Sequence, residues 1–152
     1  MRPVRICGTN RGFWLEESTS CMTADFSRSI GYFLEPLVLL GLFGERPLSI
    51  RLKGITNDSK DPSVDTFRTT SLHILKHFGV PLEGLELKIE SRGAALGGGE
   101  VVLGVPILLN NLSETTWIDE GIVKRIRGVT FSTRVSPQFG NRMVSIARGV
   151  FN

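Results

Sequence analysis

The sequence predicts an α+β fold: a βαβαββ-type repeat with two helices packed on one face of a four-stranded sheet, followed by part of a second unit. Three patterns lead to this prediction. Residues 48–55 alternate apolar and polar side chains, which is the period of a half-buried strand. Apolar residues then recur at helical spacing through residue 78, and two further strand-like segments follow at 85–90 and 100–109.

Length and composition fit a globular domain. The chain has 152 residues, of which 41% are hydrophobic and 22% are charged, and a chain of this size buries about 70% of its unfolded surface. We expect an atypical N-terminal segment over 1–26, the repeat over 27–109, a connector over 110–120, and a strand and helix of a following unit over 121–152. Residues 1–26 show no clear period, so the sequence leaves open whether the first strand of the repeat is present.

A first helix is predicted after Ser27, which suits an N-cap. Pro36 should kink this helix or end it near Glu35, because proline lacks a backbone donor and clashes with the preceding turn. Gly44 suits the C-terminal end of the helix. The helix is apolar on almost all sides, so we expect it to be buried.

The turn from Gly54 to Asp65 joins the strand at 48–55 to the second helix. Asp61 suits the N-cap of that helix, and Pro62 suits its first position, where a missing N–H costs little. A polar turn at the end of a strand is a usual place for a site in α/β proteins. We therefore expect this turn to contribute functional residues.

The strands at 85–90 and 100–109 are predicted to form a hairpin around a glycine-rich turn at 93–99. Its three consecutive glycines, 97–99, would let backbone N–H groups approach a phosphate closely. A tight turn alone would also explain them. Both interpretations remain open at this point.

Charge is unevenly distributed along the chain. The formal net charge is +3, and no acidic residue follows Glu120. A long strand is predicted from Ile122 to Val135, with a last helix opening at Ser136 and Pro137. This unit suits either an RNA- or anion-facing surface or a face that meets an acidic partner. Its basic residues are Lys124, Arg125, Arg127, Arg134, Arg142 and Arg148.

Several of these motifs together resemble a known family. Gly54-Ile55-Thr56-Asn57-Asp58, followed by Asp61-Pro62-Ser63-Val64-Asp65, resembles a loop of the RNA 3′-terminal phosphate cyclase-like proteins of ribosome assembly. True RNA 3′-phosphate cyclases usually carry Ala-Pro where this chain has Asp61-Pro62. Further matches lie at 97–102, 124–128 and 134–137, and the resemblance covers residue 27 to the C-terminus.

The resemblance implies a cyclase-type repeat and a role in ribosome biogenesis. The implied protein is a non-cyclase RNA- and protein-binding scaffold in small-subunit pre-rRNA processing, located in the nucleus and nucleolus. Implied partners are pre-rRNA and small-subunit processome proteins, including a ribosome-assembly GTPase, and no membrane. The alternatives are an ATP-dependent RNA 3′-terminal phosphate cyclase and a pre-rRNA endonuclease.

Catalysis by this chain is not expected. In true cyclases the resemblance implies a nucleophilic histidine that takes up AMP from ATP and lies in the C-terminal part. We expect this chain to be a truncated or alternatively started product that ends before that region, so no catalytic residue and no cofactor is assigned. No metal site is predicted either, because capping and the helix dipole account for two of the turn's three aspartates and a solvated helix face accounts for His73 and His77.

The candidates for RNA or partner binding combine the polar turn with the basic and glycine-rich segments. Arginine binds phosphate bidentately and stacks on unpaired bases, although an ordinary solvated sheet face would explain the same charges. The candidates are Lys53, Asn57, Asp58, Arg92, Gly97, Gly98, Gly99, Lys124, Arg125, Arg127 and Arg134.

Overall fold

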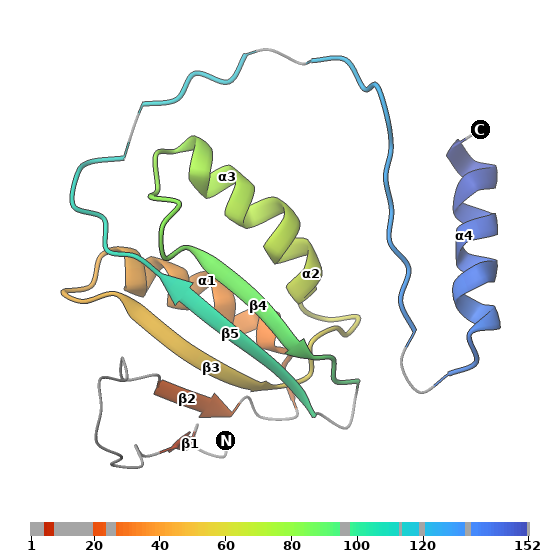
Figure 1. The fold of residues 1–152 in the computed structure, drawn as a ribbon, viewed down its shortest axis with the longest axis horizontal. Helices are drawn as coiled ribbons and strands as arrows, with labels where there is room; N and C mark the ends of the chain where they lie inside the picture. The colour runs from red at the N-terminus through yellow and green to blue at the C-terminus, as the bar shows by residue number, and fades with distance from the viewer. Residues whose placement is uncertain are drawn as a thin grey trace. The chain divides into compact units, whose positions relative to one another are not determined.

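The structure is a computed structural model that describes residues 5–7, 20–23, 27–94, 98–112, 114–118, 121–132 and 135–151. The chain divides into two compact units, residues 1–115 and 116–152. In the first unit, five strands form one sheet in the order β1-β2-β3-β5-β4 (Figure 1). These strands are β1 (Arg5–Cys7), β2 (Ser20–Thr23), β3 (Leu48–Gly54), β4 (Glu86–Ser91) and β5 (Gly99–Val105).

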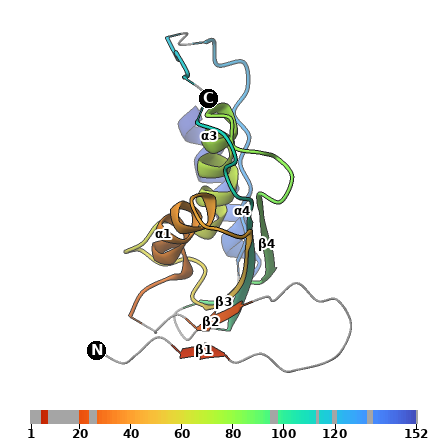
Figure 2. The same ribbon diagram turned by 90° about the vertical axis from the view of Figure 1, so that its left-hand side faces the viewer.

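Two helical stretches cover one face of this sheet (Figure 2). The first is α1 (Ile30–Leu42), and the second runs without a break through α2 (Val64–Thr66), the π-helical turn η1 (Phe67–Ser71) and α3 (Leu72–His77). The predicted α+β repeat, with two helices on one face of four strands, is therefore confirmed. Strand β1 adds a fifth strand beyond β2.

The first strand of the repeat, left open by the sequence, is β2. It pairs in parallel with β3, and α1 forms the crossover between them. Such a connection is required because parallel neighbours cannot be joined by a tight turn. β1 pairs antiparallel with β2, so part of the segment assigned as atypical belongs to the sheet. Both strands are only three or four residues long, too short for alternation to be recognised.

The core lies between the sheet and the two helices. β3 pairs with β5 so that Ile50 faces Leu103 and Leu52 faces Val101. All four side chains are at most 6% exposed, because alternate residues of each strand point toward the helices. Further buried residues complete the cluster: Ile30, Leu34, Val38, Leu42, Val64, Phe67, Leu72, Val80, Leu85, Leu87 and Val105.

Helix α1 continues through Pro36 to Leu42, so the second of the two predicted effects of Pro36, an end near Glu35, is wrong, whereas the predicted stop at Gly44 agrees with the C-cap at Phe43. Its N-cap is Ser29 rather than Ser27. Beyond the proline, Val38 and Leu42 extend the buried stripe and are 3% and 2% exposed. Burying each such side chain contributes roughly 1.5–3 kcal/mol, which offsets the ~3 kcal/mol that an internal proline costs.

The expectation that α1 is buried holds for only one of its faces. One face packs into the core, whereas the other leaves large apolar side chains exposed. The exposed fractions are 48% for Tyr32, 57% for Leu39, 70% for Leu40 and 67% for Phe43.

The second helix begins two residues later than predicted. Its N-cap is Ser63, whose hydroxyl accepts a hydrogen bond from the backbone N–H of Asp65 at 3.1 Å. Serine is among the preferred N-cap residues because its oxygen satisfies a backbone donor of the first turn. The side chain of Asp61, the predicted N-cap, instead contacts Ser29 and Arg28 at the start of α1.

The second unit contains α4 (Gln138–Phe151), which agrees with the predicted last helix. The long strand predicted from Ile122 to Val135 is not found: residues 121–132 pair with no other strand in the part of the unit that the structure describes. A strand needs a neighbour for its backbone donors and acceptors, and none is present there. No helix in the described segments is long and apolar enough to span a membrane.

The buried centre of the sheet should dominate the stability of the first unit. We expect Leu103→Ala to lower the free energy of unfolding by ~2–5 kcal/mol, because Leu103 is 0% exposed and its removal leaves a cavity. Urea unfolding of the full chain, followed by circular dichroism, measures this loss. The same substitution at Leu40, which is 70% exposed, is the control and should cost under ~0.5 kcal/mol. Equal losses would contradict the described core.

Candidate functional site

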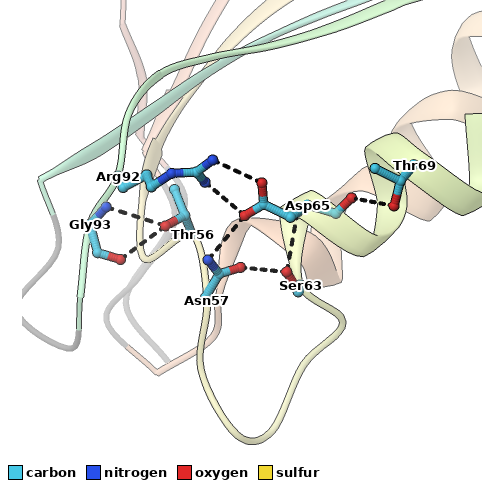
Figure 3. A network of polar contacts seen from close by, with 7 residues as sticks. All are labelled: Thr56, Asn57, Ser63, Asp65, Thr69, Arg92 and Gly93. Atoms are coloured by element: carbon cyan, nitrogen blue, oxygen red, sulfur yellow. Dashed lines mark hydrogen bonds and ion pairs between the residues drawn. The ribbon is translucent and has the colours of Figure 1, made fainter. Parts of the chain in front are cut away.

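The polar turn after β3 is tied to the loop after β4 through Thr56. The backbone N–H and the hydroxyl of Thr56 both donate to the carbonyl oxygen of Gly93, each at 3.1 Å, and the hydroxyl accepts from the Gly93 N–H at 3.2 Å (Figure 3). Thr56 is 1% exposed. A Cβ added to Gly99 would lie 2.6 Å from the carbonyl oxygen of Gly54, so glycine is required where these chains meet.

A second set of contacts joins the turn to the start of the second helix (Figure 3). Arg92 donates from both terminal nitrogens to the two carboxylate oxygens of Asp65, at 2.7 and 2.9 Å. Asn57 donates to the same carboxylate at 3.3 Å and accepts from the Ser63 hydroxyl at 2.6 Å. Bidentate pairs of this kind restrict geometry strongly, so these contacts hold the turn in one conformation.

Asp61 supports the first helix instead of capping the second. Its carboxylate accepts a hydrogen bond from the backbone N–H of Ser29, the N-cap of α1, at 2.8 Å and forms an ion pair with Arg28 at 2.9 Å. The carboxylate lies at the positive end of the helix dipole. A Cβ on Gly31 would collide with the carbonyl oxygen of Pro62, so the turn passes directly over the beginning of α1.

These contacts give three of the predicted site residues structural roles. Asn57 and Arg92 belong to the network around Asp65. Asp58 accepts hydrogen bonds from the N–H groups of Lys60 and Asp61 at 3.1 and 2.8 Å, which is typical of aspartate in a turn. The turn is therefore a structural junction whose polar side chains satisfy one another.

The glycine-rich turn is partly described. Gly98 has a φ of 86° and nothing within 4 Å of an added Cβ, whereas Gly99 packs against backbone. The described glycines therefore serve the turn and the close approach of strands. Gly97 and Arg134, also predicted as site residues, lie outside the described residues.

The sheet face opposite the helices is charged. Lys53 is exposed on this face, and Arg51 donates to the carboxylate of Glu100. This hydrogen bond lowers the pKa of Glu100, and the charge of Lys53 lowers it further. Glu100 in turn raises the pKa of Arg51. Because Glu100 pairs with Arg51, the positive charge of this face is partly balanced, and the exposed pair adds little stability.

A cationic groove lies within the second unit, between residues 123–130 and α4. Its volume is about 840 Å³. The three predicted basic residues Lys124, Arg125 and Arg127 all line it, and Arg148 of α4 adds a fourth positive charge that was not among the predicted site residues. Arg148 lies ten residues from the start of α4, so only the folded unit reveals its proximity to the others. Apolar side chains, including Val123, Ile126 and Phe151, line the same groove.

No group of three or more potential metal ligands occurs among the described residues. The three aspartates of the turn each have other partners: backbone N–H groups for Asp58, Ser29 and Arg28 for Asp61, and Arg92 for Asp65. His73 is exposed on α3. Anion binding through cationic side chains is the chemistry that the site residues support.

Comparison with known proteins identifies similar sequences. The sequence model of a family described as RNA 3′-terminal phosphate cyclase matches residues 10–139, so the similarity begins earlier than residue 27. A probable RNA 3′-terminal phosphate cyclase-like protein of Arabidopsis thaliana is 64% identical over 86% of this chain and 35% of its own length.

Two further relatives show the same partial coverage. The RNA 3′-terminal phosphate cyclase-like protein of Homo sapiens is 49% identical over 82% of this chain and 34% of its own length. The rRNA processing protein rcl1 of Schizosaccharomyces pombe is 48% identical over 83% of this chain and 35% of its own length. The chain thus spans about a third of the length of the curated relatives it matches.

The junction at Asp61 should be required for a stable first unit. We expect Asp61→Ala to lower the free energy of unfolding by ~1–3 kcal/mol, because it leaves the Ser29 N–H without an acceptor and removes the partner of Arg28. Thermal and urea unfolding measure the change. Glu45→Ala, at an exposed carboxylate after α1, is the matched control and should be within ~0.5 kcal/mol of the unsubstituted chain. If Asp61→Ala left the free energy of unfolding unchanged, the contacts of Asp61 would contribute nothing to stability.

Proposed function

The chain belongs to the RNA 3′-terminal phosphate cyclase family, and from that membership we propose that it acts in small-subunit pre-rRNA processing as a non-cyclase scaffold that binds RNA and protein. Two observations support the proposal. A relative 48% identical to this chain is named an rRNA processing protein. The second unit also presents a groove lined by four cationic side chains.

The cationic groove is the observation that carries RNA binding. Lysine and arginine attract phosphate over long range, and arginine stacks on unpaired bases. Lys124, Arg125 and Arg127 are exposed and contribute to one surface with Arg148. Apolar side chains between these charges suit contacts with bases or with a protein partner. The groove can therefore hold single-stranded RNA beside a protein surface.

The proposed setting is the nucleolus. The partners proposed there are pre-rRNA and small-subunit processome proteins, including a ribosome-assembly GTPase. A basic C-terminal unit would attract both pre-rRNA and acidic protein segments. The chain's role is to hold these components together, and it transfers no chemical group.

Sedimentation tests this proposal. We expect the tagged chain to travel with pre-ribosomal particles in a sucrose gradient of nucleolar extract. Alanine at Lys124, Arg125 and Arg127 should move most of it to the top fractions, because these contacts to phosphate are lost. The control replaces Arg46, Lys60 and Arg142, which are exposed and do not line the groove, and removes the same charge. Absence of the unsubstituted chain from particles that contain a full-length relative would overturn the proposal.

A second candidate function is RNA 3′-terminal cyclisation with ATP. It is favoured by the description of the matching family. The scaffold proposal expects no cyclic product and no covalent AMP when the full chain is incubated with ATP and an RNA that ends in a 3′-phosphate. An active cyclase of the family provides the positive control. A 2′,3′-cyclic end on the RNA, or radiolabelled AMP that remains attached to denatured protein, would overturn the scaffold proposal and show that the chain is an enzyme.

A further inference from the structure

A second groove lies in the first unit, where α3 runs beside β4 (Figure 1). Its volume is about 410 Å³. Arg68, His73 and Lys76 line it from the helix, and Lys88 lines it from the edge strand. None of these four residues belongs to the polar turn, to the glycine-rich turn or to the groove of the second unit.

The charge of this groove is mainly positive and mainly unpaired. Arg68 and Lys76 are exposed and have no hydrogen-bond or ion-pair partner within the described parts of the chain. Lys88 pairs with Glu90 at 2.7 Å, which raises the pKa of Lys88, but an exposed pair of this kind is easily exchanged for another anion. Glu86 is the one acidic side chain in the lining.

The apolar floor of the groove is already covered. Leu72 and Leu85 are each 6% exposed, and Leu87 is 3% exposed, so little apolar surface remains for an incoming side chain. An apolar peptide would gain little by binding there, since affinity for such ligands follows the area removed from water. The groove instead presents charged groups at its rim, which favours a polyanion.

The helix itself is irregular at this place. Arg68 lies in η1, where the Leu72 N–H donates to the carbonyl oxygen of Phe67 five residues earlier instead of four. Single π-helical turns occur frequently at functional sites because the inserted residue changes which side chains share a face. Here the turn lies between α2, which is fixed by Ser63 and Asp65, and the cationic end of the helix. It thereby sets the direction of Arg68 relative to Lys76.

We propose that this groove binds the phosphate backbone of RNA, as a second contact for the RNA-binding scaffold; the inference rests on the proposed function. Arg68 and Lys76 are eight residues apart, which is roughly 12 Å along a helix. A single phosphate cannot bridge that span, whereas a linear chain of phosphates can. Lys88 alternates on β4 with the buried Leu87 and shares the opposite sheet face with Arg51, so Arg68 and Lys76 supply the line of positive charge on the helix side. The site is independent of base sequence because it contacts phosphates alone.

Fluorescence anisotropy with a labelled oligouridylate tests the groove in the full chain. We expect alanine at both Arg68 and Lys76 to weaken binding roughly tenfold near 100 mM salt and to reduce the slope of log K against log salt by about 1.4, because two phosphate contacts to a single strand are lost. Arg46→Ala with Lys60→Ala removes the same charge elsewhere on the first unit and should change affinity less than about twofold. Equal unfolding temperatures would show that each variant is folded.

Two additional measurements separate the groove from the general proposal. Hydrogen exchange of the unsubstituted chain should show protection of α3 and β4 on addition of the oligouridylate. The proposal for this groove would be overturned if protection were confined to residues 121–132 and α4 and if the variant with alanine at Arg68 and Lys76 bound the oligouridylate as tightly as the unsubstituted chain. RNA binding by the second unit would then still stand. Inorganic polyphosphate should bind with the same dependence on Arg68 and Lys76. If it does while the oligouridylate does not bind at all, both the RNA contact proposed here and the RNA-binding function are overturned, and the groove is a site for free polyphosphate.

A competition experiment tests the chemical class of the ligand. Polyglutamate carries a comparable line of negative charge without phosphate. We expect it to displace the oligouridylate more weakly than polyphosphate does, because arginine matches phosphate geometry bidentately. Stronger displacement by polyglutamate would assign the groove to an acidic protein segment and overturn the proposal.

Discussion

The first unit depends on how the turn after β3 is held between α1 and the loop after β4. The carbonyl oxygen of Ile55 accepts the Ile30 N–H at 2.7 Å, Thr56 exchanges three hydrogen bonds with Gly93, and Asp61 accepts the Ser29 N–H. Each contact uses a buried donor or acceptor that would be costly to leave without a partner. Together they connect α1, the turn after β3 and the loop after β4 through one short stretch of chain.

This junction gives the polar side chains of the turn structural partners within the chain. A side chain that already satisfies its neighbours has little to offer a ligand, and Asn57, Asp58 and Arg92 are all engaged in this way. Within the described parts of the chain, exposed cationic side chains line the groove of the second unit, and Arg68 and Lys76 line the groove between α3 and β4. Structural rigidity and electrostatic attraction are thus supplied by different residues.

Elements with strong periodicity were predictable from the sequence. The alternation around Ile50 and Leu52 predicts β3, and the spacing of Val64, Phe67 and Leu75 predicts the second helix. The family was also predictable, since the quoted motifs act together over most of the chain. These features depend on the order of side chains within one short segment, which the sequence shows directly.

Features that depend on distant contacts were not predictable in the same way. Pro36 lies within α1 because burial of Val38 and Leu42 outweighs the local cost of a proline inside a helix. Asp61 and Ser63 both suit an N-cap, and the N–H of Ser29, 32 residues away from Asp61, decides between them. The α3–β4 groove joins side chains from two elements whose separate patterns are those of ordinary solvated faces. The basic residues after Glu120 were evident in sequence, whereas their shared groove with Arg148 requires α4.

The strand order has a consequence for how the chain folds during its synthesis. β5 is the last of the five strands of this sheet in chain order, yet it lies between β3 and β4 and pairs with both. Until Val105 has emerged from the ribosome, β3 lacks its antiparallel neighbour and β4 has no neighbour at all. Two unpaired apolar edges are therefore present on the nascent chain, and such edges promote misassociation. Chaperone protection during translation would be needed most in the short interval before β5 inserts.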